Sequence, residues 1–586
     1  MRLFSPRHSS YNSAFPSFAA LTTKIRDRFS ADRTVVLWLG VWWLCNLLLA
    51  ASAELANDEA YYHLFAERLA WGYFDHPPMT ALLVRLGGGL LGGEIGVRLC
   101  FTLLQPLYLY ILWRLIRPAE ATQRDGALFV MLSAATLMLQ LYGFIAVPDG
   151  PLMMTATLFL LTFKWFSERR RLAWLWMGIA LALMAYSKYH GALVLLFALA
   201  ANPRLLRRPD LYSSGAVAAL LLVPHLLWQY QHDWASLAYH LAGRNAHFRL
   251  SYVTDFVANM LVVFNPLYVP IYIRAWRKTQ PDDAVRRALK LFPAAFIGFF
   301  LLSACRGYVQ PQWVIVASLG LVYVAFDYAR RHPRTRRYMM RAGWATLGIV
   351  ALVRIEMIFN PLGLRFEVFD NRTTYAAIAR EAAGRPVIFG GNYAVAAKYR
   401  FYTGGEAYCQ PDIRYRTHQW QFRDDDSRFI GREVLVETPR RAPGDTLVRT
   451  QSLALANGKE FTWLIDPAWH PVRLVDIEFD GVPRRVTPGE ELHLRLRLTN
   501  PYDYPIEIGE DCELAMLWKS GRHEVAEFAL PVRLTLAPRS TTEAETAFQV
   551  PATLAGTRCE AGFALRREGY KHWFNGKPQQ TKVEKR

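Results

Sequence analysis

Apolar runs that are long enough, or nearly long enough, to cross the roughly 30 Å hydrocarbon core of a bilayer recur through the first part of this chain. One short run of this kind also fits a buried helix of a soluble protein. About eleven in succession predict a polytopic α-helical membrane protein, with residues 34–360 as the membrane-spanning domain. The runs lie near 34–54, 97–117, 126–146, 151–167, 172–187, 190–203, 212–230, 253–276, 291–305, 313–329 and 341–359.

Basic residues predict how these runs are oriented. The chain has 68 Lys and Arg against 49 Asp and Glu, a formal net charge of +19. The basic residues gather in every second loop, which is typical of the cytoplasmic side of a membrane. A nucleic-acid-binding protein would instead interleave basic and aromatic residues on one soluble face, and the sequence does not show this pattern. The basic loops lie near 114–124, 169–171, 204–208, 274–290 and 330–337.

Residues 1–33 form a basic tail that we expect in the cytoplasm. Ala51-Ser52-Ala53 resembles a signal-peptide cleavage site, but the basic segment and the apolar run before it are both longer than those of a signal peptide. We therefore expect an uncleaved first span. An odd number of spans then leaves the C-terminus on the outer side.

The remaining chain predicts two units on that outer side. Residues 361–445 combine a helix-like stretch at 373–383 with a short apolar strand at 386–391, which indicates a small α/β unit. Residues 465–586 predict a β-sandwich-like domain. Within it, Leu alternates strictly with polar residues over 491–499, the period of a half-buried strand.

The sequence contains six cysteines. Cys45, Cys100 and Cys305 lie in or near spans, and Cys409 falls in the outer α/β unit. Cys512 and Cys559 are candidates for a disulfide in the outer compartment, although the sequence leaves their pairing open. No pair has C-x-x-C spacing, which argues against a thiolate metal site or redox motif.

The first outer loop contains the most unusual polar group, Asn57-Asp58-Glu59. Carboxylates at a membrane surface are costly and tend to be functional. Adjacent helical residues face roughly 100° apart, so Asp58 and Glu59 would divide labour, one as a base and the other orienting a partner. The alternative is that Asn57 or Asp58 caps a helix and Glu59 favours its first turn.

Other polar residues are predicted on the same side. Asp75 and His76 precede a double proline, where the alternative is a rigid turn. Asp149 follows the third run, Lys188 interrupts an apolar hairpin, and Arg306 follows a later run. The acids Asp58 and Asp149 and the bases Lys188 and Arg306 therefore share one face. Such a set suits the activation of a hydroxyl and the binding of a phosphate.

A glycine pattern in this region does not predict nucleotide binding. Gly87, Gly89 and Gly92 satisfy G-x-G-x-x-G, but no strand precedes them and they lie on the outer side. The sequence also lacks a Walker A motif and H-E-x-x-H.

Several motifs resemble the bacterial branch of the protein mannosyltransferase superfamily, which includes enzymes that add aminoarabinose or galacturonic acid to lipid A or core sugars. The motifs are Asp58-Glu59-Ala60-Tyr61-Tyr62, Gly72-Tyr73-Phe74-Asp75-His76-Pro77-Pro78-Met79, Pro148-Asp149-Gly150-Pro151, Ser187-Lys188-Tyr189, Gln312-Trp313, Pro361-Leu362-Gly363 and Gly391-Asn392-Tyr393. They span roughly residues 35–440, and the tail from about 465 departs from the family pattern. Gln312 also departs, because relatives often have His before this Trp.

The resemblance implies a C-type glycosyltransferase fold in the bacterial inner membrane, with the C-terminal domains in the periplasm. It implies a polyprenyl-phosphate sugar donor and places Asp58 at the catalytic acid–base position, with Glu59 as its motif neighbour. Tyr61, Tyr73 and His76 would contribute to substrate binding, with Asp149, Lys188 and Arg306. The acceptor would be a lipid such as lipid A, an envelope glycan or a protein.

The expected reaction is a single displacement with inversion, in which Asp58 takes the acceptor proton while Lys188 and Arg306 stabilise the departing phosphate. No cofactor is indicated with certainty, and a divalent metal near Glu59 or Asp149 is left open. The alternatives are a transporter or flippase for a lipid-linked sugar, or a non-catalytic envelope scaffold. A transporter would favour internal repeats and charges near the membrane midplane, whereas these polar residues lie at one face.

Overall fold

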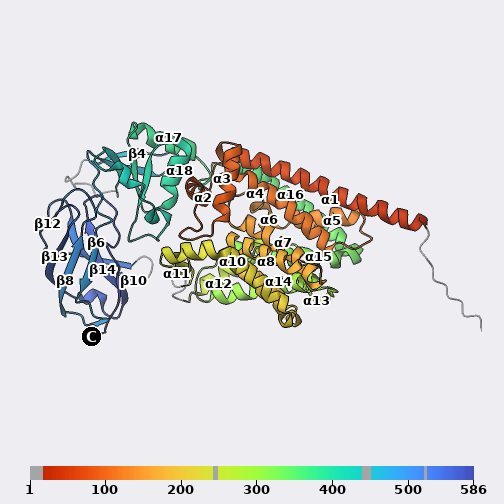
Figure 1. The fold of residues 1–586 in the computed structure, drawn as a ribbon. Helices are drawn as coiled ribbons and strands as arrows, with labels where there is room; N and C mark the ends of the chain where they lie inside the picture. Colours follow the sequence, from red (N-terminus) through yellow and green to blue (C-terminus); the bar gives the residue numbers. More distant parts are fainter. Residues whose placement is uncertain (1–17, 242–247, 439–449, 521–523, 586) are drawn as a thin grey trace, which may run out of the picture.

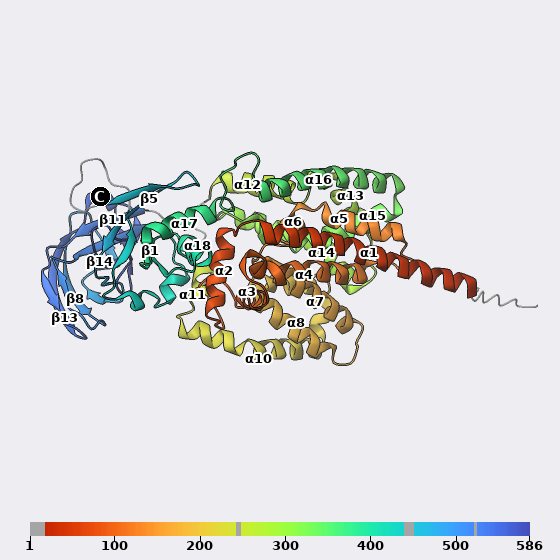
Figure 2. The ribbon, with the colours of Figure 1, turned by 90° about the horizontal axis from the view of Figure 1, so that it is seen from above.

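The computed structural model describes residues 18–241, 248–438, 450–520 and 524–585. Helices form one elongated bundle, and two smaller units that contain the described strands lie at one end of it (Figures 1 and 2). Residues 1–17 of the expected basic tail lie outside the described residues. The rest of that tail belongs to the first helix, α1 (Phe18–Ser52).

The predicted apolar runs correspond to helices of the bundle. Within the described residues, five helical segments are long and apolar enough to cross a membrane: Ser30–Ser52 of α1, α4 (Gly93–Ile116), α10 (Pro209–Gln231), α14 (Ala284–Ala304) and α16 (Pro333–Phe359). The other runs form α5 (Gln123–Ala134), α7 (Asp149–Ser167), α8 (Ala173–Ser187), α9 (Gly191–Ala200), α12 (Leu250–Val263), α13 (Val269–Lys278) and α15 (Ala317–Arg331). The number of membrane crossings stays a prediction.

Two of the predicted runs are interrupted. The run at 126–146 breaks between α5 and the short α6 (Leu137–Leu141), and the run at 253–276 breaks between α12 and α13. Asn265 in the second break has a left-handed φ of 71°, and the proline after it cannot continue a helix. Asn265 Nδ2 donates to the carbonyl oxygen of Ala135 at 3.0 Å, so a hydrogen bond joins the two breaks.

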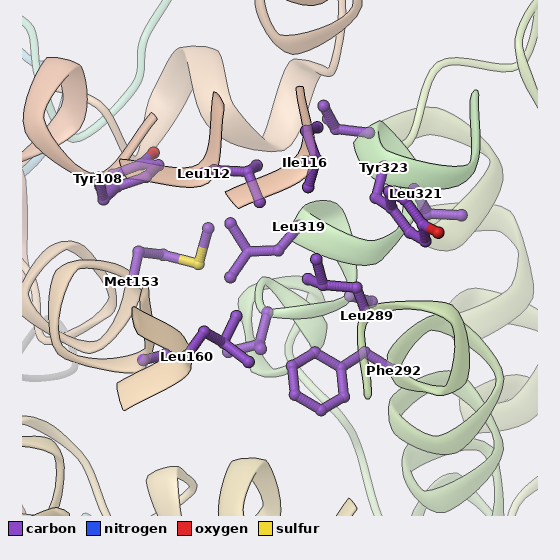
Figure 3. Packing of buried hydrophobic residues seen from close by; sticks show 14 of the residues in the cluster. Tyr108, Leu112, Ile116, Met153, Leu160, Leu289, Phe292, Leu319, Leu321 and Tyr323 are labelled. Atoms are coloured by element: carbon purple, nitrogen blue, oxygen red, sulfur yellow. The ribbon is translucent and has the colours of Figure 1, made fainter. Parts of the chain in front are cut away.

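The bundle is apolar both inside and outside. Its interior packs side chains such as Leu112, Met153 and Leu289 from α4, α7 and α14 against α15 (Figure 3). On its outer surface, Leu302 and Phe359 are each 73% exposed. Large apolar surfaces of this kind are unfavourable in water but suit lipid, and the chain is a membrane protein.

One glycine of the pattern near residue 87 serves helix packing, whereas Gly89 and Gly92 have open space where a Cβ would lie. A side chain at Gly87, in α3 (Met79–Leu90), would put its Cβ only 2.3 Å from the carbonyl oxygen of Gly96 in α4. Glycine is therefore required where these two helices come closest.

The first unit beyond the bundle is α/β, as predicted. Its sheet has the order β2-β1-β3-β5-β4, in which β1 runs parallel to β2 and β3, and β5 antiparallel to β3 and β4. The elements are α17 (Asn371–Ala382), β1 (Val387–Gly390), α18 (Tyr393–Thr403), β2 (Ala407–Gln410), β3 (Val434–Glu437), β4 (Gln451–Ala454) and β5 (Glu460–Asp466). The expected boundary at residue 445 is too early, because β4 and β5 complete this sheet; residues 439–445 lie outside the described part.

The second unit is a β-sandwich. One sheet has the order β11-β10-β14-β15-β7, the facing sheet β13-β8-β6, and β12 pairs with β9. Strand β8 (Glu491–Thr499) buries every second residue, as its Leu alternation predicted. The other strands are β6 (Asp476–Asp480), β7 (Arg485–Val486), β9 (Ile506–Ile508), β10 (Glu513–Ser520), β11 (Glu524–Ala529), β12 (Leu534–Leu536), β13 (Thr541–Gln549), β14 (Arg558–Arg566) and β15 (Gln579–Val583).

All six cysteines are free thiols, and the disulfide considered between Cys512 and Cys559 does not form. Both side chains are buried in the sandwich core, where they pack as small apolar groups.

We therefore expect a thiol titration of the denatured, unreduced chain to find six reactive thiols. Reduction should leave the thermal midpoint of the native protein unchanged, because it breaks no cross-link. A count two lower, with a lower midpoint after reduction, would contradict the free-thiol assignment.

Candidate functional site

The predicted polar residues lie at the end of the bundle that meets the α/β unit. The chain leaves α1 at Ser52 and turns back into α2 (Asn57–Glu67), after which the turn 71–78 leads into α3. Helix α18 and the segment 411–426 of the α/β unit face these elements, through contacts described below. The site is thus built from both parts of the chain.

Glu59 is fully buried and satisfied by structural contacts. Its carboxylate accepts from Arg98 Nε at 2.7 Å and Arg98 Nη2 at 2.5 Å. It also accepts the backbone N–H groups of Ala56 and Ala146, each at 2.9 Å. A carboxylate offers about four acceptor positions, so none is left for a substrate or a metal ion. Glu59, which we expected to share the catalytic work with Asp58, is instead occupied in holding Arg98 and two backbone N–H groups.

Asp58 differs from its neighbour, because it is half-buried and keeps a free oxygen. Its Oδ1 accepts a hydrogen bond from the Tyr393 hydroxyl of α18 at 2.6 Å. Its Oδ2 has no hydrogen-bond partner within the described part of the chain. Burial, and next the charge of Asp58, hold the pKa of Tyr393 well above its usual value, so this hydroxyl stays protonated as a donor.

Tyr62 lies among three of the carboxylates that the sequence placed on one side. Burial, followed by the charges of Asp58, Asp75 and other nearby groups, raises the pKa of Tyr62 well above its usual value. Asp149 is the weakest of these contributors. The Tyr62 hydroxyl therefore stays protonated beside these carboxylates.

Asp149 and Lys188 form a buried ion pair at 2.6 Å. Asp149 opens α7, where a negative charge suits the helix N-terminus. Lys188 follows the last residue of α8. The structure brings these two residues together, and each neutralises the charge of the other.

The turn 71–78 presents Asp75 and His76 to the site. Asp75 forms ion pairs with His76 at 3.2 Å and with Arg416 at 3.1 Å. Burial raises the pKa of Asp75, but these two partners outweigh it and hold the pKa well below its usual value. His76 Nε2 lies 3.3 Å from the Tyr62 hydroxyl. Asp75 therefore stays ionised and fixes His76 and Arg416.

The segment 411–426 closes the site from the α/β unit. The Arg416 guanidinium lies 4.4 Å from the ring centre of Tyr393, whose hydroxyl binds Asp58. The backbone N–H of Gln419 donates to the Tyr61 hydroxyl at 2.6 Å. Arg416 could not be predicted as a site residue from the sequence, because no motif surrounds it. Tyr393 could have been predicted, since it belongs to one of the motifs shared with the protein mannosyltransferase superfamily.

Two predicted residues take other positions. The Tyr73 hydroxyl is used within its own turn, where it donates to the Phe65 carbonyl at 3.1 Å and accepts from the Ala70 N–H at 3.1 Å. Arg306 is exposed beyond α14 and forms no ion pair with any described residue. Arg306 thus has no contact among the described residues that ties it to the cluster around Asp58.

A metal site was left open near Glu59 or Asp149. Within the described ranges, His, Cys, Asp and Glu residues form no group of three or more that could hold a metal ion. Both carboxylates are instead engaged by cationic side chains. We derive no step through a metal.

In sequence, part of the chain is similar to known glycosyltransferases. The family described as dolichyl-phosphate-mannose-protein mannosyltransferase matches residues 75–228. The lipid A galacturonosyltransferase RgtD of Rhizobium johnstonii is 29% identical over 213 residues, which are 34% of this chain and 43% of RgtD. The chain thus spans less than half the length of this curated relative.

Solved structures give the fold. ArnT from Cupriavidus metallidurans in the apo state matches with a TM-score of 0.55 and 13% identity. The same protein bound to undecaprenyl phosphate matches with a TM-score of 0.54 and 14% identity. Each match covers 73% of this chain and 97% of ArnT. The chain has the C-type glycosyltransferase fold of ArnT, and the family match over residues 75–228 agrees with the expected resemblance to protein mannosyltransferases.

Glu59→Gln should lower the free energy of unfolding by about 3–5 kcal/mol, because it leaves the Arg98 charge buried without its counter-ion. The measurement is unfolding of the purified protein in mixed micelles. Asp282→Asn is the matched control, since Asp282 is 68% exposed in its i,i+4 pair with Arg286; it should cost less than about 1 kcal/mol. Equal losses in the two variants would contradict the structural role of Glu59.

Proposed function

We propose that this protein is an integral-membrane glycosyltransferase. It moves a sugar from a polyprenyl-phosphate donor to a hydroxyl or phosphate of a lipid, glycan or protein acceptor. The observation that carries the proposal is the free oxygen of Asp58, a carboxylate that Tyr393 orients at 2.6 Å in a chain with the C-type glycosyltransferase fold. ArnT, which shares this fold, has been solved with undecaprenyl phosphate, and RgtD is named for sugar transfer to lipid A.

In the proposed reaction, Asp58 is the general base. As the acceptor oxygen bonds to the anomeric carbon, its proton passes to Asp58 Oδ2, and the bond from that carbon to the phosphate oxygen breaks. The products are the glycosylated acceptor, polyprenyl phosphate and a protonated Asp58, which then releases its proton to water. One displacement inverts the anomeric configuration. Base assistance of this kind contributes roughly 10²–10⁴ in rate.

The phosphate of the donor gains negative charge as it leaves. Lys188 can stabilise this charge by exchanging its contact with Asp149 for one with phosphate, and Arg416 supplies a second cation near Tyr393. Arg416 takes the role expected of Arg306, which is exposed and forms no ion pair with a described residue. Tyr61, Tyr62 and His76 line the same site.

We propose a bacterial inner membrane location, with the site on the periplasmic side. The basic loops meet at the opposite end of the bundle, where Arg286 donates to the Ile116 carbonyl and Arg287 to Asn202. Such loops are typical of the cytoplasmic side. The α/β unit contacts α2, so it and the adjoining sandwich lie on the same side as Asp58.

Asp58→Asn should reduce sugar transfer at least about 100-fold without loss of stability, because the amide cannot accept the proton. Tyr393→Phe should reduce it less, by about tenfold, through loss of one hydrogen bond to a charged group. The assay is transfer from a polyprenyl-phosphate sugar in proteoliposomes. Glu381→Gln, at an exposed carboxylate of α17, is the control and should keep full activity. Transfer by Asp58→Asn at the normal rate would overturn the base assignment.

Lys188→Met should raise the KM for the lipid-linked donor about tenfold or more, because a charged contact with phosphate is lost. Asp149→Asn should leave this KM unchanged or lower it, since Lys188 is then free to bind phosphate. Lys164→Met, at the other end of α7, is the matched control. If Asp149→Asn raised the KM as much as Lys188→Met, the pair would have a purely structural role.

A further inference from the structure

A cavity of about 330 Å³ lies between the α/β unit and the β-sandwich, outside the site around Asp58. One wall comes from β2 and the segment 411–426, including Tyr408, Gln410 and Gln421. The other comes from the segment before β6 and from the loop between β14 and β15. Its volume lies within the range of small-molecule sites, and such sites often lie where two domains meet.

Aromatic side chains form much of the lining. Trp469 and Tyr570 stack with ring centres 5.7 Å apart. Trp573 is half-buried in the loop between β14 and β15, and Phe422 is 37% exposed. Trp469 itself is only 1% exposed, so the accessible aromatic area comes from its neighbours such as Trp573 and Phe422. Such faces offer apolar area while leaving the polar edge of a ligand free to form hydrogen bonds.

The charged side chains around the cavity cancel one another. Each cation in the lining has a carboxylate partner, so the cavity offers little excess positive charge to a phosphate or an acidic sugar. The pairs are Arg473 with Asp426 at 2.5 Å, Lys571 with Asp412 at 2.8 Å, His572 with Glu527 at 3.2 Å and Arg567 with Asp466 at 3.6 Å.

Neutral polar groups supply the remaining hydrogen-bonding capacity. Gln410 and Gln421 use their side-chain oxygens to accept the backbone N–H groups of Lys571 and His418. Their amide nitrogens, and the Thr417 hydroxyl, have no partner within the described residues. A ligand with many hydroxyl groups and an apolar face matches this combination of free donors and aromatic rings.

One chain segment connects this cavity to the site around Asp58. Thr417 and Gln421 line the cavity. Gln419, which lies between these two residues in the sequence, accepts the backbone N–H of Phe74 at 2.8 Å. Arg416, which precedes Thr417, forms an ion pair with Asp75. A molecule in the cavity is therefore separated from the site by a single segment of chain.

We propose that this cavity binds a neutral oligosaccharide portion of the acceptor. The assignment to the acceptor rests on the proposed glycosyltransferase function, whereas binding itself does not. The proposal narrows the acceptor to a molecule that carries a glycan. The two C-terminal units would hold this glycan while the reacting group of the acceptor reaches Asp58.

Binding is tested on the full chain in nanodiscs by tryptophan fluorescence. The probes are neutral gluco-, galacto- and manno-oligosaccharides of three to six sugars, with a galacturonic acid trimer and inorganic phosphate as anionic comparisons. We expect saturable binding of a neutral probe. Trp573→Ala should weaken it about five- to tenfold through loss of an aromatic contact, and Gln421→Leu should weaken it to a similar degree. Lys577→Ala lies in the same loop, is exposed and is outside the lining, so it should not change binding.

Two further measurements separate the proposal of glycan binding from the proposed glycosyltransferase function. Asp58→Asn should bind the neutral probe like the wild type. In the transfer assay, Gln421→Leu should raise the KM for a glycan-bearing acceptor with little change in kcat. If the wild type transferred no sugar, the proposed function would fail while the binding result stood. The cavity proposal is overturned if no neutral probe binds up to 10 mM, if an anionic probe binds more tightly, or if both lining variants bind like the wild type.

Discussion

The buried ion pair between Glu59 and Arg98 sets the geometry of the site. Arg98 also donates to the carbonyl oxygens of Ala50 and Ala53 at the end of α1, at 3.2 and 2.6 Å. Glu59 in turn binds the backbone at the start of α2 and before α7. Backbone groups at helix ends have no partners of their own, and at a membrane boundary water does not reliably provide them. One pair of opposite charges therefore joins the ends of three helices to the N-terminal part of α4, and it holds the backbone beside Asp58, the residue before Glu59.

The site needs both parts of the chain. The bundle and its short connections provide Asp58, Asp75 and the pair of Asp149 and Lys188. The α/β unit provides Tyr393 and Arg416, which bind the first two of these acids. Because the contacts are short and charged, small rotations between the two parts would alter both the orientation of Asp58 and the charge around it. The packing of α18 on α2 is thus as important to the proposed chemistry as the carboxylate itself.

Sequence patterns predicted most of the architecture, because apolar length and Leu alternation report burial directly. The helix breaks at Asn265 and after Ala134 were hidden, since an apolar run continues through each of them. The β4 and β5 strands were not assigned to the α/β sheet, because pairing between distant segments leaves no local pattern. The acids at 58 and 149 and the base at 188 were found from their position at one face. The different roles of Asp58 and Glu59 depend on Arg98, which lies 39 residues after Glu59. A contact between residues so far apart in the sequence cannot be predicted from the motif that contains Asp58 and Glu59.

Tyr393 lies 335 residues after the carboxylate that it orients. During biosynthesis, α2 emerges early, while the hydroxyl that completes its acidic centre has not yet been made. The nascent chain therefore carries an unfinished centre until the α/β unit has folded against α2. If Asp58 is the base, as proposed, an immature copy has this carboxylate without its orienting hydroxyl, and folding of the C-terminal part determines when the centre is complete.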